Sequence, residues 1–285
     1  PERISRRQFS RTGPKQTIYI EEIGSPVVDS EGQISGRLLV LRDVTEQKQL
    51  ADYRDEITHM AVHDLRGPLA SIISSLSFTL EDSSIISDEA TLRQTLGLSL
   101  ESAMNLMRLV ESLLDIARLE RRQMPLHFIP TTIEILVSET IFTLTSSIQS
   151  ANVTVERDIT PDIPSLNVDH DIIRRVLVNL VDNALRFTPA DSKILIEARD
   201  FPEYVLIRIA DSGPGIPPEE RERIFERFRQ VKANQPLRGS RGVGLGLTFC
   251  KLAVENHGGR IWVDSDSPLS GACFALTLPH NPTIR

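Results

Sequence analysis

The sequence predicts a multidomain protein in which an all-α helical hairpin is followed by an α+β sandwich, with a short β-rich segment in front. Three observations carry this prediction. Residues 1–43 contain strand-like runs separated by turn signals, and residues 44–123 carry a regular apolar stripe on charged, helical sequence. Over residues 124–285, short β-rich runs alternate with helical patterns, which is typical of helices packed on a sheet. These three ranges are the expected domains.

The composition limits the class of protein before any motif is considered. The chain has 285 residues, of which 40% are hydrophobic and 25% are charged, as in ordinary soluble proteins. Its formal net charge of -7 argues against a nucleic acid as the main partner. The two cysteines provide no disulfide framework, and no apolar run reaches the length of about 18 residues that a membrane helix needs. We therefore expect a cytoplasmic chain without membrane contact.

The first range, 1–43, contains the β-rich runs QTIYIEEIGSPVVDS and GRLLVLRDV, with a turn signal over residues 29–32. Three strands without a helix make a poor independent domain. The sequence also opens at Pro1, inside what resembles the middle of a domain. We therefore expect the end of a larger sheet domain, in a longer protein whose upstream part could attach it to the inner membrane.

Two long helices are expected in the second range, 44–123. The first keeps its apolar residues on one side and continues beyond Pro68. The second repeats apolar or small residues at alternating spacings of four and three, which is a heptad pattern. The residues of this repeat are Leu92, Leu96, Ser99, Ala103, Leu106, Val110, Leu113 and Ala117.

A second apolar stripe on the same helix, at Leu100, Met107 and Leu114, widens the apolar face beyond what one partner helix covers. One hairpin buries only part of such a surface. A symmetric pair of hairpins would bury it in a four-helix bundle, so we expect a homodimer. The alternative is a long hairpin packed on another domain of the same chain.

His63 is the first candidate for chemistry. It lies nearly opposite the apolar arc of the first helix, so we expect its ring to face water. A solvated surface histidine is the simplest interpretation, and a weak metal pair with His59 is another. The adjacent Asp64 favours function, because a carboxylate can hold one imidazole nitrogen protonated and leave the other as a nucleophile. Pro68 is expected to bend the helix just beyond.

A second group of candidates lies in DHDIIRRVLVNLVDNALRFTP. Asp169 is a plausible N-cap for a helix over residues 169–187. Asn179 and Asn183 stand four residues apart, hence on one face of that helix, and Arg186 follows three residues later. Neutral amide oxygens can bind Mg²⁺ beside phosphates, and a guanidinium can meet phosphate oxygens. Paired asparagines on a helix are weak evidence when taken alone.

A third group, IADSGPGIP, follows a predicted strand. Glycines let the backbone approach a flat ligand, and Asp211 at the strand end can accept a hydrogen bond from an exocyclic amine. A surface β-turn is the alternative interpretation of this segment.

The fourth group, GSRGVGLGLTFCKLAVENHGG, leads from Gly242, Gly244 and Gly246 into an apolar helix, whose N-terminus would form an anion site. It is neither a Walker motif nor a dinucleotide fingerprint. Before it, ERIFERFRQVKANQPLRGSRG predicts a short amphipathic helix with Phe225 and Phe228, followed by a polar, basic loop suited to a mobile lid.

In this order the motifs resemble the core of a sensor histidine kinase of two-component signalling, from about Val44 to Leu278. HDLRGPL resembles the H box, NLVDNALRFTP the N box, DSGPGIP the G1 box, IFERF the F box and GVGLGL the G2 box. LLDIARLE resembles the end of the second hairpin helix. The implied fold is a dimerisation and histidine-phosphotransfer hairpin followed by an ATP-binding domain of the Bergerat (GHKL) type. Residues 1–43, which end in the exit motif RDVTEQ, more loosely resemble the last strands of a PAS sensor domain.

The resemblance implies a role for each candidate. His63 would accept the γ-phosphoryl group of ATP, with Asp64 as general base or orienting group. Asn183, helped by Asn179, would bind Mg²⁺, and Asp211 would read adenine. The remaining residues implied in ATP binding are Arg186 (where the family more often has lysine), Phe187 (where an aromatic lines the nucleotide), Gly213, Gly215, Ile216, Arg241, Gly242, Val243, Gly244, Leu245, Gly246 and Leu247.

The implied function is autophosphorylation of His63 within a homodimer, followed by phosphotransfer to an aspartate of a response regulator. Sister ATPases of this fold carry a glutamate where Asn179 stands and use it to activate water, which an amide cannot do. The alternatives are an ATPase of the same fold and a non-catalytic dimeric scaffold. One departure concerns Gly67, because the family typically has Thr or Asn four residues after the phosphoacceptor. We expect phosphatase activity towards the partner to be weak or to be supported by other residues.

Overall fold

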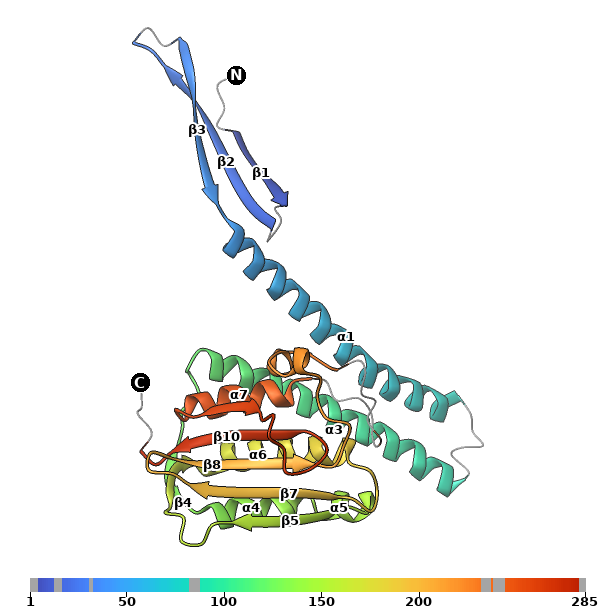
Figure 1. Ribbon diagram of the computed structural model, residues 1–285. Coiled ribbons are helices and arrows are strands. Elements are labelled where there is room, and N and C mark those ends of the chain that lie inside the picture. The colour runs from blue at the N-terminus through green and yellow to red at the C-terminus, as the bar shows by residue number, and fades with distance from the viewer. Residues whose placement is uncertain are drawn as a thin grey trace. The chain divides into compact units, whose positions relative to one another are not determined.

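The computed structural model describes residues 5–12, 17–30, 33–81, 88–231, 237 and 244–281, without the side chains of residues 28, 49–61 and 63. The chain divides into two compact units, Pro1–Asp64 and Leu65–Arg285. The elements of both are labelled in Figure 1.

The first unit begins with a three-stranded antiparallel sheet in the order β1-β2-β3, so that β2 is central. The strands are β1 (Ser5–Thr12), β2 (Thr17–Val28) and β3 (Ile34–Asp43). Two cross-strand ion pairs join the first two strands, from Arg6 to Glu21 at 2.7 Å and from Arg7 to Glu22 at 2.9 Å. Both glutamates are buried. The strands predicted for this segment are therefore present.

Helix α1 (Thr45–Glu81) starts directly from this sheet. The N–H of Tyr19 in β2 donates to Thr45 Oγ1 at 2.8 Å, and the N–H of Val44 donates to Tyr19 O at 2.9 Å. Asp43 Oδ1 accepts from the N–H of Thr45 at 2.9 Å, which satisfies a free donor at the helix start. The central strand and the first turn of α1 are thus joined by hydrogen bonds.

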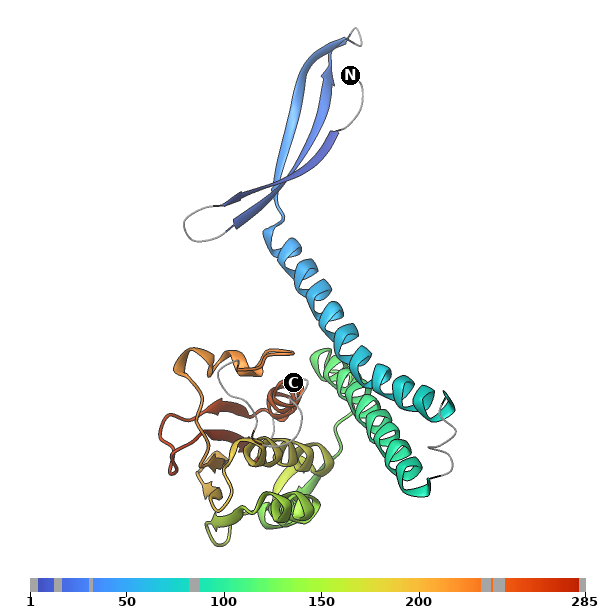
Figure 2. The ribbon, with the colours of Figure 1, turned by 90° about the vertical axis from the view of Figure 1, so that its right-hand side faces the viewer.

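The hairpin of the second unit consists of the end of α1 and of α3 (Glu89–Glu120), which lie side by side in both ribbon views (Figures 1 and 2). Helix α1 continues through Pro68 without an interruption. Asp88 caps α3 by accepting from the N–H of Ala90 at 3.3 Å. The hydroxyl of Ser102 in α3 donates to that of Ser71 in α1 at 3.3 Å.

The second apolar stripe predicted on this helix is exposed in α3. Leu100, Met107 and Leu114 expose 63%, 64% and 53% of their surface. Further along the helix, Ile116 and Leu119 are fully buried and belong to the core of the following domain. The same helix therefore has an uncovered apolar face over one part and a buried one over another.

The ATP-binding domain implied by the resemblance has a five-stranded mixed sheet in the order β5-β7-β8-β10-β9. Strand β5 is parallel to β7, and the other neighbours are antiparallel. The strands are β5 (Thr154–Ile159), β7 (Lys193–Asp200), β8 (Tyr204–Asp211), β9 (Arg260–Val263) and β10 (Cys273–Pro279). A separate two-stranded ladder, not predicted from the sequence, pairs β4 (Phe128–Thr131) with β6 (Leu166–Asp169).

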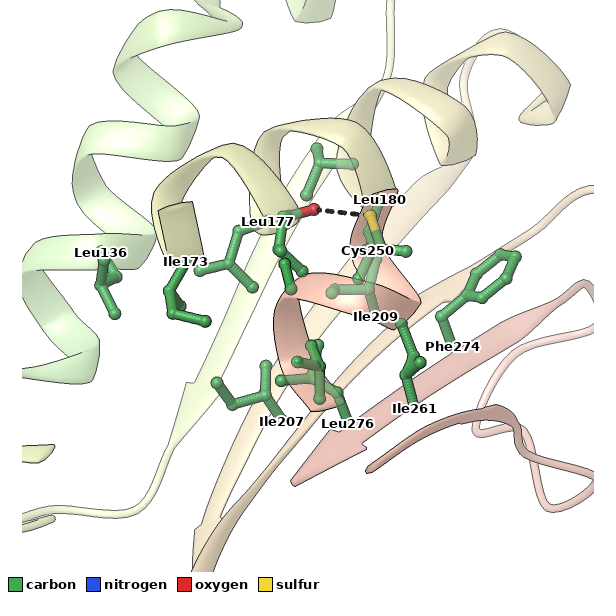
Figure 3. Packing of buried hydrophobic residues seen from close by; sticks show 14 of the residues in the cluster. Leu136, Ile173, Leu177, Leu180, Ile207, Ile209, Cys250, Ile261, Phe274 and Leu276 are labelled. Atoms are coloured by element: carbon green, nitrogen blue, oxygen red, sulfur yellow. Dashed lines mark hydrogen bonds between the residues drawn. The ribbon is translucent and has the colours of Figure 1, made fainter. Parts of the chain in front are cut away.

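Helices cover one face of the five-stranded sheet (Figure 1). They are α4 (Ile133–Thr143), α5 (Thr145–Ala151), α6 (His170–Phe187) and α7 (Gly246–Asn256). The chain is divided between α4 and α5 at Leu144. Figure 3 shows Leu177 and Leu180 of α6 beside Cys250 of α7, above sheet residues that include Ile207 and Leu276. An α+β sandwich, as predicted, is confirmed.

The opposite face of the sheet is charged. Glu197 in β7 pairs with Arg208 in β8 at 2.8 Å, and Arg199 pairs with Asp158 in β5. Alternate residues of β7, such as Ile196, face the helices and are buried. This alternation is what a strand with one covered and one open face requires.

The prediction of a short amphipathic helix around Phe225 and Phe228 is wrong. The segment forms two 3-10 turns, η1 (Pro218–Glu220) and η2 (Arg223–Phe225). Phe228 then adopts a left-handed backbone conformation with φ 58°, and its N–H donates to Gly244 O at 3.0 Å. Because this φ ends any right-handed helix, a long-range contact replaces the local pattern.

The end of α3 packs on α6 and α7. The guanidinium carbon of Arg175 in α6 lies 4.1 Å from the ring centroid of Phe249 in α7. The same guanidinium donates to Ser112 Oγ at 3.1 Å and pairs with Asp115, both in α3. Asn256 in α7 donates to the carbonyl of Leu119 at 3.2 Å. The hairpin therefore packs on a domain of its own chain, as the alternative interpretation of the second helix supposed, but only over this part of α3.

Candidate functional site

Helix α6 presents the two asparagines. Asp169 caps the helix by accepting from the N–H of Ile172 at 3.1 Å, which confirms the predicted N-cap. Val176 and Leu180 are fully buried against the sheet, whereas Asn179 and Asn183 are half-buried. The apolar side of α6 thus fixes the helix and leaves both amides on its other side.

Helix α7 begins beside Asn179. A Cβ built on Gly246, the first residue of α7, would lie 3.8 Å from Asn179 Cγ, so the backbone of the helix start is close to this amide. The thiol of Cys250 in α7 donates to Val176 O at 3.7 Å (Figure 3). Burial raises the pKa of this thiol to about 12, so it is structural and unreactive.

Asp211 ends strand β8 and is buried. Its Oδ1 accepts two backbone N–H groups, from Gly213 at 2.8 Å and from Ala272 at 3.1 Å. Burial raises the pKa of this carboxyl above its ordinary value, and the two N–H groups oppose that effect. No hydrogen bond from the described part of the chain ends on Oδ2, so this oxygen is open to a donor from a ligand.

Glycines surround this carboxylate. A Cβ on Gly213 would lie 2.8 Å from Asp211 Oδ1 and 2.9 Å from the carbonyl oxygen of Phe187, so any side chain would collide. This contact brings the end of α6 next to the turn after β8. Gly215 has a positive φ of 75°, which favours glycine. Gly215 and Ile216 also line a pocket of about 450 Å³, between this turn and residues 265–271.

The predicted phosphate loop is described only in part. Arg241, Gly242 and Val243 lie outside the described residues. Gly244 has a φ of 78°, and a Cβ there would lie 2.7 Å from the Phe228 carbonyl carbon, so it joins two distant turns. Leu245 is buried, and Leu247 packs partly against the core.

Arg186 is bound within its own helix. Its guanidinium pairs with Asp182 Oδ2 at 3.0 Å, and both side chains are more than one-third exposed. A surface pair of this kind is weak, so the guanidinium can exchange this partner for a phosphate.

His63 and Asp64 belong to the first unit, whereas the other candidates belong to the second. His63 lies within α1, and its side chain is outside the described residues, as is that of His59. The expected exposure of the His63 ring therefore stays a prediction. Gly67 is exposed, and a Cβ built on it would meet nothing within 4 Å.

Two residues of the site were not found from the sequence. Gly271 and Ala272 precede β10, and their backbone reaches Asp211 through three hydrogen bonds. The only local signal was a glycine directly before an apolar strand in SPLSGACFALTL.

Within the described part of the chain, no group of three or more His, Cys, Asp or Glu side chains could hold a metal ion. This finding does not concern asparagine amides, on which the predicted Mg²⁺ site depends. None of the helices described is both long enough and apolar enough for a membrane crossing.

Two family models match the sequence, one over the helical hairpin and one over the sheet domain. The His Kinase A (phospho-acceptor) domain matches residues 53–122. The Histidine kinase-, DNA gyrase B-, and HSP90-like ATPase matches residues 168–282.

Known proteins extend these matches over most of the chain. An adaptive-response sensory kinase SasA from Synechococcus sp. (strain JA-3-3Ab) is 30% identical over 268 residues, which cover 92% of this chain and 70% of the relative. The chain belongs to the sensor histidine kinases. Another SasA, from Synechocystis sp. (strain ATCC 27184 / PCC 6803 / Kazusa), is 35% identical over 85% of this chain. This histidine kinase chain spans 63%, 60% and 56% of the length of three SasA relatives.

Solved structures of histidine kinases share the fold. The structure of histidine kinase ThkA in complex with response regulator protein TrrA aligns with a TM-score of 0.61 and 23% identity, over 98% of this chain and 79% of that chain. The Acinetobacter baumannii histidine kinase AdeS aligns with a TM-score of 0.60 and 24% identity, over 77% of this chain and 98% of that chain.

Proposed function

We propose that this chain is a protein-histidine kinase, which transfers the γ-phosphoryl group of ATP to His63 and passes it on to an aspartate of a response regulator. The observation that carries the proposal is the hydrogen bonding of the Asp211 carboxylate. Two backbone N–H groups hold one of its oxygens, and the other is open beside the asparagine-bearing helix α6. A buried carboxylate with one free oxygen is suited to an amine donor.

Adenine fits this end of the site. Its exocyclic amine would donate to Asp211 Oδ2, and the glycines at 213 and 215 leave room for a flat ring against the backbone. Ile216 and Phe187 would line the ring with apolar surface; both are half-buried.

The phosphates would extend along α6 towards the start of α7. Asn183 and Asn179 would hold Mg²⁺ through their amide oxygens, and the ion would neutralise phosphate charge. Arg186 would exchange Asp182 for a phosphate oxygen. The free N–H groups at the start of α7 suit an anion, with the remaining loop residues, Arg241, Gly242, Val243, Gly244, Leu245, Gly246 and Leu247, shaping this end.

Transfer then requires an unprotonated imidazole nitrogen. The lone pair of that nitrogen of His63 attacks the γ-phosphorus, a N–P bond forms, and the bond from phosphorus to the bridging oxygen breaks, so that ADP leaves with the electron pair. Asp64 would hold the proton on the other ring nitrogen throughout. Since Asn179 has no basic group with which to activate water, transfer is favoured over hydrolysis.

The hairpin supports a homodimer. Its apolar stripe at Leu100, Met107 and Leu114 is exposed in a single chain, and the phospho-acceptor family to which this segment is similar suggests dimerisation. Burying a stripe of this size against a second copy would complete a four-helix bundle. The surface around His63 would then receive the response regulator, by analogy with ThkA, whose structure is a complex with one.

Residues 1–43 would transmit the signal as the end of a PAS-like sensor domain, with 44–123 as the signalling helix and hairpin and 124–285 as the catalytic domain. The hydrogen bonds of Tyr19 with Val44 and Thr45 support this role, because they couple the sheet to the start of α1. We place the kinase core in the cytoplasm, with no nucleic acid partner and no membrane contact.

Incubation with γ-labelled ATP and Mg²⁺ tests the proposal. We expect label on the protein that is stable to base and labile to acid, as a phosphoramidate bond requires. Release of free phosphate without protein label would instead indicate an ATPase. Failure to bind Mg·ATP would indicate a scaffold.

A further inference from the structure

The backbone of residues 271 and 272 is hydrogen-bonded to Asp211. Asp211 donates its N–H to Ala272 O at 2.9 Å, and Gly271 donates its N–H to Asp211 O at 3.0 Å. The antiparallel ladder between β8 and β10 therefore continues beyond its last strand pair, Ala210 with Cys273. The third bond, from the N–H of Ala272 to Asp211 Oδ1 at 3.1 Å, connects this ladder to the carboxylate itself.

Space at Gly271 is restricted by the same carboxylate. A Cβ built there would lie closer than 3.0 Å to Asp211 Oδ1, to Gly213 N and to Asp211 O, and real Cβ atoms essentially never lie so close. The backbone of Gly271 does not have a positive φ, so its conformation does not demand glycine. The missing side chain is what allows the strand end to reach the carboxylate.

We propose that Gly271, together with the N–H of Ala272, is a positioning element that fixes the Asp211 carboxylate and thereby sets the selectivity of the site for a purine that carries an exocyclic amine. The inference rests on the proposed function, in which Asp211 Oδ2 accepts that amine. Oδ1 accepts hydrogen bonds from two sides, from the N–H groups of Gly213 and Ala272. Rotation of the carboxylate is therefore restricted, and Oδ2 points in one fixed direction.

An alanine at 271 would force the carboxylate or the Gly213 turn to move, since two of the three crowded atoms are backbone. Either movement breaks at least one N–H bond to Oδ1 and turns Oδ2 away from the amine. Binding of the ribose and phosphates depends on other residues, so the loss should fall on the recognition of the base.

Gly259 offers a matched control. A Cβ there would collide with the carbonyl oxygen of Thr277, next to the first residue pair of the β9–β10 ladder, Arg260 with Thr277. Gly259→Ala therefore strains β10 towards its other end, far along the strand from Asp211. Both substitutions should lower the thermal stability of the chain, but only the side chain added in Gly271→Ala contacts the Asp211 carboxylate.

The test compares dissociation constants of the whole chain for ATP and for purine riboside triphosphate, which lacks the 6-amino group. A hydrogen bond to a charged acceptor predicts that the native chain prefers ATP by about tenfold or more. We expect Gly271→Ala to reduce the preference to within about threefold, and Gly259→Ala to keep the native value. Because both ligands are measured on one preparation, the ratio does not depend on the fraction of folded protein.

Retention of the native preference by Gly271→Ala, or an equal loss in Gly259→Ala, would overturn the inference. Asp211→Ala separates this outcome from failure of the proposed function. If that variant also keeps the native preference, Asp211 does not read the base and the proposed site is wrong. If Gly271→Ala does not fold, Ala272→Pro removes the N–H to Oδ1 without a side chain at 271, and the same loss of preference is expected.

Discussion

Large apolar side chains are exposed in the hairpin but buried in the ATP-binding domain. Leu100 of α3 is 63% exposed, whereas Leu180 of α6 is fully buried. The domain closes its apolar surface within one chain, by packing helices on a single sheet (Figure 3). The hairpin leaves an apolar stripe exposed in a single chain, and in the proposed function a second copy would cover it. In the proposed function, the residue that accepts the phosphoryl group lies on α1 and the site that donates it lies in the ATP-binding domain.

The largest effect is expected at the exposed apolar stripe of α3, where the proposed dimer would form. Leu100→Glu combined with Met107→Glu places charges on the stripe in both copies of a symmetric dimer. At about 1.5 kcal/mol for each apolar side chain no longer buried, the dimer should lose about 6 kcal/mol and be monomeric at micromolar concentration. Sedimentation equilibrium measures this, with ATP binding unchanged.

Phe142→Glu is the control for that experiment. Phe142 is 82% exposed on α4 of the other region, so its replacement should leave the mass in solution unchanged. A double variant that stays dimeric would show that the stripe on α3 is not the interface.

A smaller effect is expected in the closed core. Leu180→Ala should lower the free energy of unfolding of the ATP-binding domain by about 3 kcal/mol, because it leaves a cavity between α6 and the sheet. Leu100→Ala should change it by less than about 0.5 kcal/mol. Urea denaturation followed by the fluorescence of Trp262, the single tryptophan, measures both. Equal costs at the two positions would contradict the contrast between the regions.

The dependence of stability on pH should come from the closed domain as well. The buried His257 accepts the N–H of Asp169 on Nε2 at 3.1 Å and shares Nδ1–H with Ala253 O at 2.7 Å. Burial lowers the pKa of His257 below its ordinary value, although the charge of Asp169 opposes this. The unfolded chain therefore takes up a proton at a higher pH than the folded chain, and stability falls as the pH falls below about 6.5.

Unfolding measured from pH 7.5 to 5 should show this slope in the native chain and much less of it in His257→Gln. His127→Gln, at an exposed position, should keep the slope. An identical slope in all three proteins would assign the effect to other groups.

The smallest effect is expected in the hairpin helices at their two open glycines, Gly67 and Gly97, where a Cβ meets nothing within 4 Å. Alanine at either position should stabilise the chain by about 0.5–1 kcal/mol through helix propensity.

Gly67→Thr should increase dephosphorylation of the response regulator, because it introduces the residue type that the family has at this position. Native dephosphorylation as brisk as that of Gly67→Thr would refute this role.

Local patterns predicted much of this fold. Helix α6 and its cap at Asp169 were predicted, because periodicity and capping depend on neighbouring residues. The turn at Phe228 was not predicted, because its conformation depends on a hydrogen bond to Gly244, which is distant in the sequence.

Part of the candidate site could be proposed from the sequence. Asn179, Asn183 and Asp211 were proposed because their motifs are short and follow one another in order along the chain. Gly271 and Ala272 were missed because they meet Asp211 only through strand pairing, across a separation of 61 residues in the case of Ala272. Nothing in the sequence around them records that contact.

The central claim is that the donor site in the closed domain serves an imidazole on the hairpin. The most direct measurement is the label retained on protein after incubation with γ-labelled ATP, for the native chain and for His63→Gln at equal ATP occupancy. We predict that His63→Gln binds ATP as the native chain does and carries no label. Label retained on His63→Gln at the native level would contradict the account.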